Sequence, residues 1–129
     1  MIVLWNSAEM TVRLVLVSSD GAQTQYEWEV GRSLARDMLA YLRDRLSEHH
    51  KGFNDITGIG VFRGPGSYTG LRIGMTVLNT FATAQKIPIV GSVAGDWENE
   101  CLMRLASKQD DKLVLPEYGG EAHVTKPRK

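Results

Sequence analysis

The first thirty residues alternate between apolar and polar side chains in a way that predicts three consecutive β-strands. Apolar residues recur at every second position from Val12 to Leu16 and again from Tyr26 to Val30, as expected where one face of a sheet is buried. Asp20-Gly21 lies between these segments and predicts a hairpin turn. The predicted strands are residues 2–5, 11–18 and 23–30.

The rest of the chain alternates between helical and strand-like segments. Ser33 can cap a helix running to about residue 49, because apolar residues follow it at intervals of three or four positions. The elements predicted after it are a strand at 56–62, a helix at about 69–85, a short strand at 87–90, a helix capped by Ser92 and a final strand at 113–115. The order βββαβαβα predicts an α/β fold in which helices cover a mixed sheet. It resembles one lobe of the actin-like ATPase and ribonuclease H group of folds, with residues 1–115 as the lobe and residues 116–129 as an extended tail.

A glycine-rich loop joins the strand at 56–62 to the helix that follows it. Ser67 or Thr69 can cap that helix, unpaired N–H groups at its start favour an anion, and Arg72 adds positive charge. The candidate anion-binding residues are Gly64, Gly66, Ser67, Thr69, Gly70 and Arg72. The spacing meets neither the Walker pattern nor the dinucleotide-binding pattern. Two interpretations therefore stay open: the loop binds an anion, or its glycines only allow a sharp turn and close packing of helix on sheet.

The helix at about 69–85 is apolar on two sides. Leu71, Met75 and Leu78 occupy one side, whereas Ile73 and Val77 occupy much of the other. Such a helix must be covered on both sides. The sheet can cover one side, and the other needs either a neighbouring helix of the same domain or a second protein chain, as in a helix-mediated dimer.

Composition narrows the class of protein. A chain of 129 residues is long enough for one domain with a real core, and its 15 basic and 15 acidic residues cancel, so no overall field attracts nucleic acid or a membrane. Cys101 is the single cysteine, which excludes an intrachain disulfide and favours a reducing compartment. No stretch reaches the roughly 18 apolar residues that span a bilayer. We expect a cytoplasmic protein with no membrane contact.

Candidate catalytic residues are few. The three histidines, His49, His50 and His123, form no HExxH or HxxxH pattern, and the first two are predicted to end a helix. Cys101 falls on the apolar face of the third predicted helix and is expected in the core, while Ser67 has no evident histidine partner. We expect no catalytic residue, no metal and no cofactor.

Residues 64–74, with the sequence GPGSYTGLRIG, closely resemble the signature of the TsaB (YeaZ) family. Tyr68 in place of the common phenylalanine is the only change across these positions. A looser resemblance extends over about residues 1–108, and Pro116-Glu117-Tyr118 resembles the Pro-x-Tyr element near the C-terminus of the family.

The resemblance implies an actin-like ATPase fold and a role in making threonylcarbamoyladenosine at position 37 of tRNA. TsaB-like proteins are non-catalytic partners of the TsaD transferase and work with the TsaE ATPase, so tRNA contact is expected to be indirect. They pair with TsaD, or with themselves as dimers, through the first two helices of the lobe. Carried over to this chain, the contact positions are Leu34, Met38, Leu42, Leu71, Met75, Leu78 and Phe81.

Two departures from the family pattern point away from catalysis. Family members usually have two lobes, whereas this chain has the length of one lobe and a tail. The family also commonly carries an aspartate after the first strand, where this chain has Asn6, which lacks the carboxylate that orients a metal or water. A small nucleotide- or phosphate-binding domain using the loop at 64–74 is the alternative function, and a glycoprotease-like peptidase is a weaker third.

Overall fold

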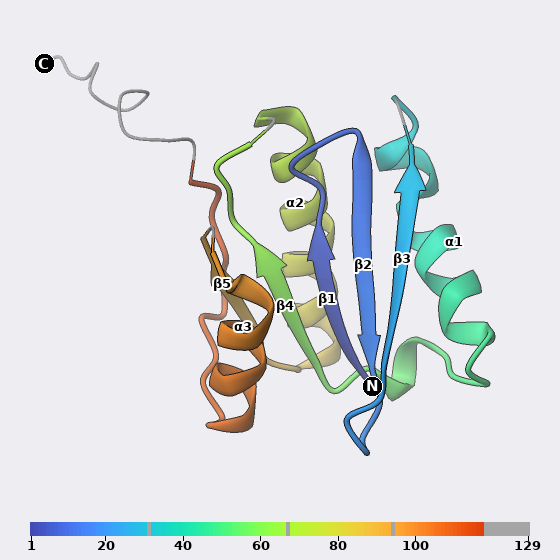
Figure 1. The fold of residues 1–129 in the computed structure, drawn as a ribbon, viewed down its shortest axis with the longest axis vertical. Helices are drawn as coiled ribbons and strands as arrows, with labels where there is room; N and C mark the ends of the chain where they lie inside the picture. The colour runs from blue at the N-terminus through green and yellow to red at the C-terminus, as the bar shows by residue number, and fades with distance from the viewer. Residues whose placement is uncertain (31, 67, 94, 118–129) are drawn as a thin grey trace, which may run out of the picture.

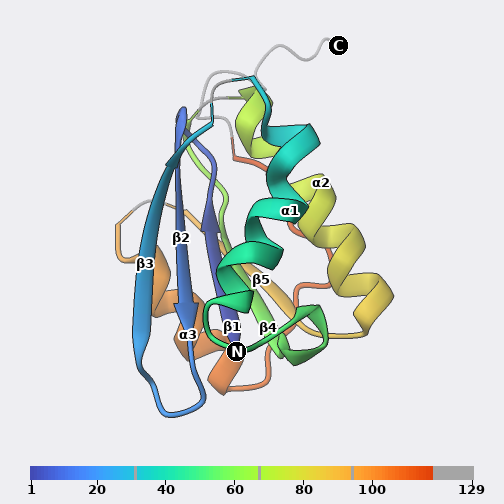
Figure 2. The same ribbon diagram turned by 90° about the vertical axis from the view of Figure 1, so that its right-hand side faces the viewer.

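The computed structural model describes residues 1–30, 32–66, 68–93 and 95–117, in which five strands form one sheet in the order β3-β2-β1-β4-β5. Helices α1 and α2 cover one face of this sheet and α3 covers the other (Figures 1 and 2). The elements are β1 (Ile2–Asn6), β2 (Thr11–Val17), β3 (Gln23–Glu29), α1 (Leu34–Ser47), the 3₁₀ turn η1 (Phe53–Asp55), β4 (Gly58–Phe62), α2 (Tyr68–Gln85), β5 (Ile89–Ser92) and α3 (Trp97–Ala106).

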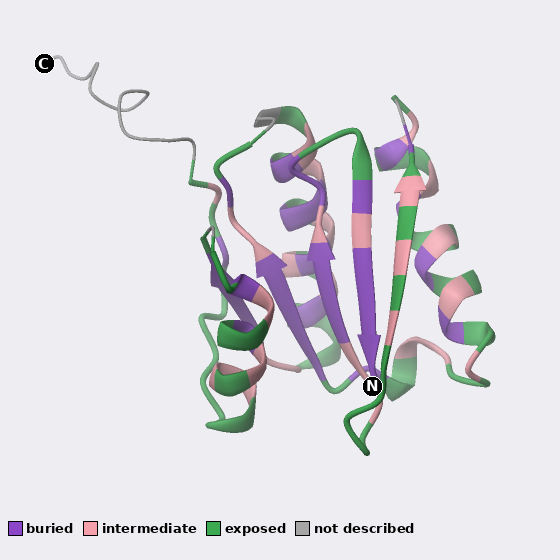
Figure 3. Cartoon of the chain, viewed as in Figure 1, coloured by how far each residue is buried: buried purple, intermediate pink, exposed green. Residues whose placement is uncertain are grey.

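The sheet is mixed, as the sequence predicts. β1 pairs antiparallel with β2, with Leu4 opposite Val15, and parallel with β4, with Leu4 opposite Gly60. β2 pairs antiparallel with β3, and β4 pairs parallel with β5. The order of elements therefore confirms the predicted α/β lobe, and the alternation in β3 is confirmed as a partly buried face that contains Tyr26 and Trp28 (Figure 3).

The hydrophobic core forms two layers, one on each face of the sheet. The larger layer joins strand residues such as Trp5 and Leu14 to the inner sides of α1 and α2. The smaller layer joins Leu4 and Val15 to Trp97 and Cys101 of α3. Neighbouring residues of one strand enter opposite layers because successive side chains of a strand point to opposite faces.

Helices α1 and α2 end in the same way. His50 and Lys86 adopt left-handed backbone conformations with φ of 59°. The N–H of the following residue then bonds back into the last turn, from Lys51 to the Leu46 carbonyl at 3.0 Å and from Ile87 to the Ala82 carbonyl at 3.1 Å. These bonds satisfy carbonyl groups that a helix end leaves unpaired.

The two predicted serine caps differ from the structure. Ser33 occupies the position before α1, but its hydroxyl donates to the Val30 carbonyl at 2.9 Å and makes no cap bond. Ser92 lies within β5 and donates to the Glu100 carboxylate, so the prediction that it caps α3 is wrong. Asp96 precedes α3 instead, because the chain continues β5 through Ser92 before it turns.

The predicted strand at residues 113–115 is not a strand. This part of the chain is an irregular segment that bends at Lys112 and Leu113, and the side chain of Asn79 takes the place of a neighbouring strand. Its amide donates to the Val114 carbonyl and accepts from the Val114 N–H, both at 2.9 Å. We call residues 110–117 the strap; it passes the β5 edge of the sheet (Figure 1).

The strap is tied to β5 near its start. The Asp111 N–H donates to the Ile89 carbonyl at 2.8 Å, and the Asp111 carboxylate accepts from the Gly91 N–H at 2.9 Å. Arg104 of α3 also donates to that carboxylate. Of the predicted tail, Pro116 and Glu117 belong to this strap, and the remaining residues, 118–129, lie outside the described residues.

Candidate functional site

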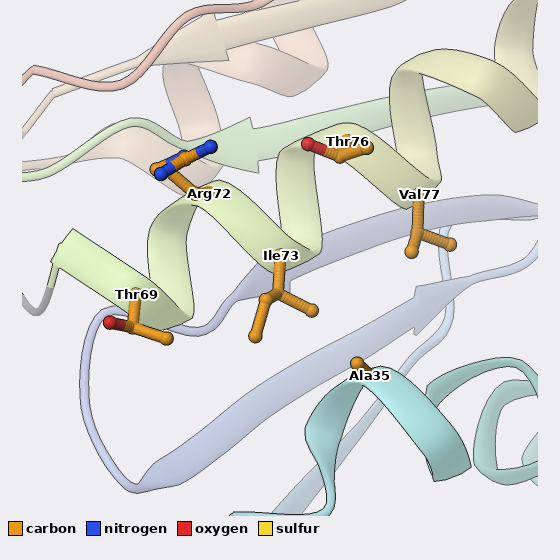
Figure 4. Close-up of a pocket in the computed structure, with 6 residues that line it drawn as sticks. All are labelled: Ala35, Thr69, Arg72, Ile73, Thr76 and Val77. Atoms are coloured by element: carbon orange, nitrogen blue, oxygen red, sulfur yellow. The ribbon is translucent and has the colours of Figure 1, made fainter.

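A hollow of about 400 Å³ opens between α1 and α2 on the side away from the sheet. Ile73 and Val77 project from α2 toward α1, where Ala35 stands opposite them (Figure 4). The lining residues are Ala35, Thr69, Arg72, Ile73, Thr76 and Val77. Because Ala35 carries only a methyl group, the two helices leave space between their outer edges.

The walls of this hollow are anchored from beneath. Met38 of α1 and Leu78 of α2 have no exposed surface, and both pack on the sheet. Ile73 and Val77 are half-buried, so one part of each side chain supports the core and another part faces the hollow. The site is therefore a preformed apolar depression held by the core, which is the form that an apolar side chain of another protein can fill.

The outer side of α2 is almost free of charge. Arg72 is the single charged residue among its 18. The other exposed positions described in this helix are four threonines, Thr69, Thr76, Thr80 and Thr83, and the uncharged Ala84 and Gln85 at its end. A surface helix normally carries charged residues on its solvent side, whereas the centre of a protein interface is depleted of them. The composition of α2 therefore favours contact with another protein.

The structure corrects most of the predicted contact positions. Six of the seven have at most 5% of their surface exposed, since they form the inner faces of α1 and α2 against the sheet: Leu34, Met38, Leu42, Leu71, Met75 and Leu78. Phe81, the seventh, is half-buried and packs edge-on against Phe53 with ring centroids 5.4 Å apart. A side chain in the core cannot reach a partner, so a contact surface on these helices must use the outer residues instead.

The glycine-rich loop packs closely against the rest of the lobe. Gly64 has φ of 124°, and a Cβ there would lie 2.3 Å from the Glu117 carbonyl of the strap. A Cβ on Gly66 would lie 2.4 Å from the Ala8 side chain. These approaches support the interpretation in which the glycines permit close packing, because neither position has room for a side chain.

The start of α2 packs equally closely on β1. A Cβ on Gly74 would lie 2.4 Å from the Ser7 hydroxyl and 2.6 Å from Nε1 of Trp5. That hydroxyl accepts from Trp5 Nε1 at 3.0 Å and donates to the Gly70 carbonyl at 2.8 Å. The last glycine of the signature thus lets α2 sit directly on the buried Trp5.

The candidate anion-binding residues do not form one described cradle. Thr69 lies inside α2, which begins at Tyr68, so it is not the residue before the helix. Thr69 and Arg72 both line the hollow beside α1. Ser67 lies outside the described residues. Anion binding by this loop stays a prediction, and the described contacts of Gly64 and Gly66 are packing contacts.

The predicted core position of Cys101 is confirmed. Its thiol has no exposed surface, and burial raises its pKa to about 12. The neutral thiol therefore dominates at physiological pH, and a buried neutral thiol is a poor nucleophile.

The histidines at the end of α1 lie where the sequence predicts. His49 Nε2 is 3.0 Å from the Tyr26 hydroxyl, which also donates to the Glu48 carboxylate at 2.9 Å. These contacts tie the helix end to β3. Within the described residues, no three side chains of the metal-binding types gather as a metal site would require.

Asn6 serves the turn after β1. Its side-chain oxygen accepts the Ala8 N–H at 2.9 Å, which closes the turn towards β2.

None of the described helices is both long and apolar enough to cross a membrane.

Sequence reasoning recognised Ile73 and Val77 as a second apolar side of α2, but it missed Ala35, Thr76 and the strap. The lack of charge along α2 was a usable signal for Thr76. Ala35 carried no signal, since a small residue becomes informative only when a neighbouring helix leaves space beside it.

The strand order and the three covering helices define the class of protein as a lobe of the actin-like ATPase and ribonuclease H type. Solved structures agree with this fold. YeaZ from Pseudomonas aeruginosa superposes with a TM-score of 0.65 at 24% identity, over 71% of this chain and 43% of that one. Another P. aeruginosa structure, described as similar to peptidase YeaZ, gives a TM-score of 0.66 at 24% identity over 71% of this chain and 42% of that one.

The model of the TsaD family, described as tRNA N6-adenosine threonylcarbamoyltransferase, matches residues 29–93. This stretch is half of the chain, so the chain belongs to that family, taken broadly to include the TsaB (YeaZ) proteins. The resemblance seen in residues 64–74 is thereby confirmed.

Curated relatives carry both names. The tRNA threonylcarbamoyladenosine biosynthesis protein TsaB is 29% identical in Bacillus subtilis, over 65% of this chain and 37% of that protein. TsaB of Escherichia coli is 25% identical over 77% of this chain and 46% of that protein. A tRNA N6-adenosine threonylcarbamoyltransferase of Dehalococcoides mccartyi is 28% identical over 65% of this chain and 29% of that protein. The chain therefore spans less than half the length of these relatives.

Proposed function

We propose that this chain is a non-catalytic partner subunit of a TsaD-like transferase in the biosynthesis of threonylcarbamoyladenosine at position 37 of tRNA. The observation that carries the proposal is the hollow between α1 and α2 together with the almost uncharged outer side of α2. An apolar hollow beside an almost uncharged helix is unusual on a surface that faces only water. A protein partner can fill the hollow and cover the threonines of α2.

The family relationship supports the choice of partner. The segment that contains α1, β4 and α2 matches the TsaD model, so a TsaD-like transferase has a corresponding pair of helices. Two related helix pairs can pack face to face around a pseudo-twofold axis, since each then offers the other the same type of surface. The same face would allow the free chain to form a homodimer while no transferase is bound.

The absence of a catalytic role is part of the proposal. Asn6 is used by a turn and Cys101 is buried as a neutral thiol, so neither is available for chemistry. In the proposed assembly the transferase performs the reaction, a TsaE-like ATPase joins the complex, and tRNA reaches this subunit only indirectly. Zero net charge supports that last point, because direct tRNA binding requires a basic surface. We place the complex in the cytoplasm.

The test is a matched pair of substitutions analysed with the TsaD-like transferase of the same organism. Thr76→Arg places a long cation on the exposed ridge of α2 beside the hollow, without touching the core. Met103→Arg makes a comparable change on α3, at a side chain that is 67% exposed on the opposite face of the sheet. Size-exclusion chromatography with light scattering should show a complex with the wild type and with Met103→Arg, and none with Thr76→Arg.

Two results would contradict the proposal. One is a wild-type chain that forms no complex with the transferase when the two are coexpressed. The other is an unchanged level of the modified nucleoside in tRNA after deletion of the gene. Equal binding by the Thr76→Arg and Met103→Arg variants would mean that the chain still binds the transferase, but through a surface other than the outer side of α2.

A further inference from the structure

The strap presents two leucines to solvent. Leu113 is 58% exposed and Leu115 is 59% exposed, whereas Val114 between them is 2% exposed. The backbone of Val114 is held by its paired hydrogen bonds with Asn79, and its side chain packs in the core, so the leucines on either side of it are left at the surface. Val114 thus anchors the strap in the core, with one exposed leucine on each side of it.

The exposed leucines belong to a segment that is held on both sides. Arg63 Nε donates to the Leu115 carbonyl at 2.8 Å, and the Glu117 N–H donates to the Arg63 carbonyl at 2.8 Å. Together with the paired bonds between Asn79 and Val114 and the bonds of Asp111 to β5, these contacts hold the backbone on either side of each leucine. A partner that covers the leucines therefore loses little conformational entropy by ordering them.

A second hollow, of about 330 Å³, lies between α2 and the strap. Leu113, Leu115 and Pro116 line it from the strap side. Arg72 and Thr76 of α2 line this hollow and also the hollow beside α1. The two depressions thus flank one ridge, and that ridge is the outer side of the almost uncharged helix.

We infer that the partner-binding face extends across α2 onto the strap, and that the transferase inserts an apolar side chain between α2 and Leu113 and Leu115. The inference rests on the proposed function, because it assigns the second hollow to the same partner. Continuity supports this assignment: a protein that covers the ridge at Thr76 from the α1 side also reaches the strap side. The chemistry supports it too, since Arg72 is the one charged residue among the described residues that line the second hollow, and the strap adds two exposed leucines to that lining, which suits an apolar partner side chain.

The experiment uses the full chain with two serine substitutions, Leu113→Ser and Leu115→Ser, and Met103→Ser as the matched control. Both changes remove exposed apolar surface, so the unfolding temperature should stay close to that of the wild type. Titration calorimetry against the transferase should show an affinity about tenfold weaker for the double variant and an unchanged affinity for the control.

A cross-link gives an independent measurement. Cys101 is the only cysteine and is buried with a pKa of about 12, so a maleimide photo-cross-linker will react selectively with a new exposed cysteine. Leu115→Cys should cross-link to the transferase, and Met103→Cys should not.

The outcomes separate this inference from the proposed function. If the serine double variant binds as tightly as the wild type while Thr76→Arg abolishes binding, the strap is not part of the interface and the proposed function stands. If Leu115→Cys cross-links only to a second copy of this chain in the presence of transferase, the inference is overturned in favour of a homodimer contact. If the wild type does not bind the transferase at all, the inference and the proposed function fail together.

Discussion

Helices α1 and α2 lie on the same face of the sheet, and their inner sides are alike while their outer sides differ. Both inner sides consist of buried apolar residues, such as Leu42 in α1 and Leu78 in α2. The outer side of α1 carries adjacent ion pairs, Arg36 with Asp37 and Arg43 with Asp44. The outer side of α2 carries threonines and Arg72 as its single charge.

The comparison shows what determines the composition of each surface. Any helix that covers the sheet needs an apolar inner side, so the inner sides of α1 and α2 have the same apolar composition. The outer side of a helix that faces water needs only to be polar, and in α1 charged side chains make it so. The exposed ion pairs of α1 add little stability, so the contrast between the helices concerns solubility and partners more than folding.

The largest expected effect tests whether the inner sides are equivalent. Leu42→Ala and Leu78→Ala should each lower the free energy of unfolding by about 3 kcal/mol, because each removes a fully buried side chain and leaves a cavity. Urea denaturation measures both. A loss below about 1 kcal/mol for either variant would show that its helix is not packed on the sheet as described.

A feature that α1 lacks is the direct contact of α2 with β1 at Gly74. Gly74→Ala should lower the free energy of unfolding by about 2 kcal/mol, because its Cβ would lie 2.4 Å from the Ser7 hydroxyl. Gly52→Ala is the control, since a Cβ there meets nothing within 4 Å, and it should be close to neutral. A Gly74→Ala variant more stable than the wild type would mean that helix propensity outweighs the contact.

The strap borders α2, whereas no such segment borders α1 in the part of the chain that the structure describes. We expect the attachment of the strap to depend on pH. Burial alone would raise the pKa of Asp111, but hydrogen bonds from Arg104 and from the Gly91 N–H outweigh it and hold the pKa below its ordinary 3.8. The stabilisation is therefore complete above about pH 4 and is lost as the pH falls through the lower folded-state value.

Asp111→Asn measures this contribution. The variant should lose up to about 1 kcal/mol of unfolding free energy at pH 7, since the carboxylate is partly exposed and solvent weakens the ion pair. Denaturation curves at a series of pH values should show the difference from the wild type shrinking towards pH 3. A difference that grows on acidification would contradict the assignment.

The smallest expected effect on folding concerns the outer sides themselves. Thr80→Lys on α2 and Arg43→Thr on α1 exchange the two surface types at exposed positions, and each should change the free energy of unfolding by less than about 0.5 kcal/mol. Binding to the transferase should weaken only for Thr80→Lys. Equal binding by both variants would show that the contrast between the helices has no functional meaning.

The sequence predicted local structure well wherever a local pattern carried the information. The alternation in β3, the helical spacing of α2 and the burial of Cys101 are all seen in the structure. Each depends on the spacing of a few consecutive residues, which the backbone geometry of strands and helices constrains directly.

Predictions failed where a residue's role depends on distant parts of the chain. Ser92 was expected to cap a helix because a serine before an apolar run commonly does so, but β4 draws it into the sheet. Residues 113–115 resemble a strand, yet Asn79 pairs with them in place of a strand.

The amino-acid sequence by itself determined the order of elements, the α/β class and the family, since these follow from periodicity and from the signature at residues 64–74. Only the tertiary structure decided which side of α1 and α2 faces outward. Both sides of α2 are apolar in sequence, and packing against the sheet is what buries Leu71 and leaves Ile73 at the hollow. The same packing leaves Leu113 and Leu115 at the surface, because Val114 between them is buried and paired with Asn79 of α2, a contact between distant parts of the chain that no local pattern indicates.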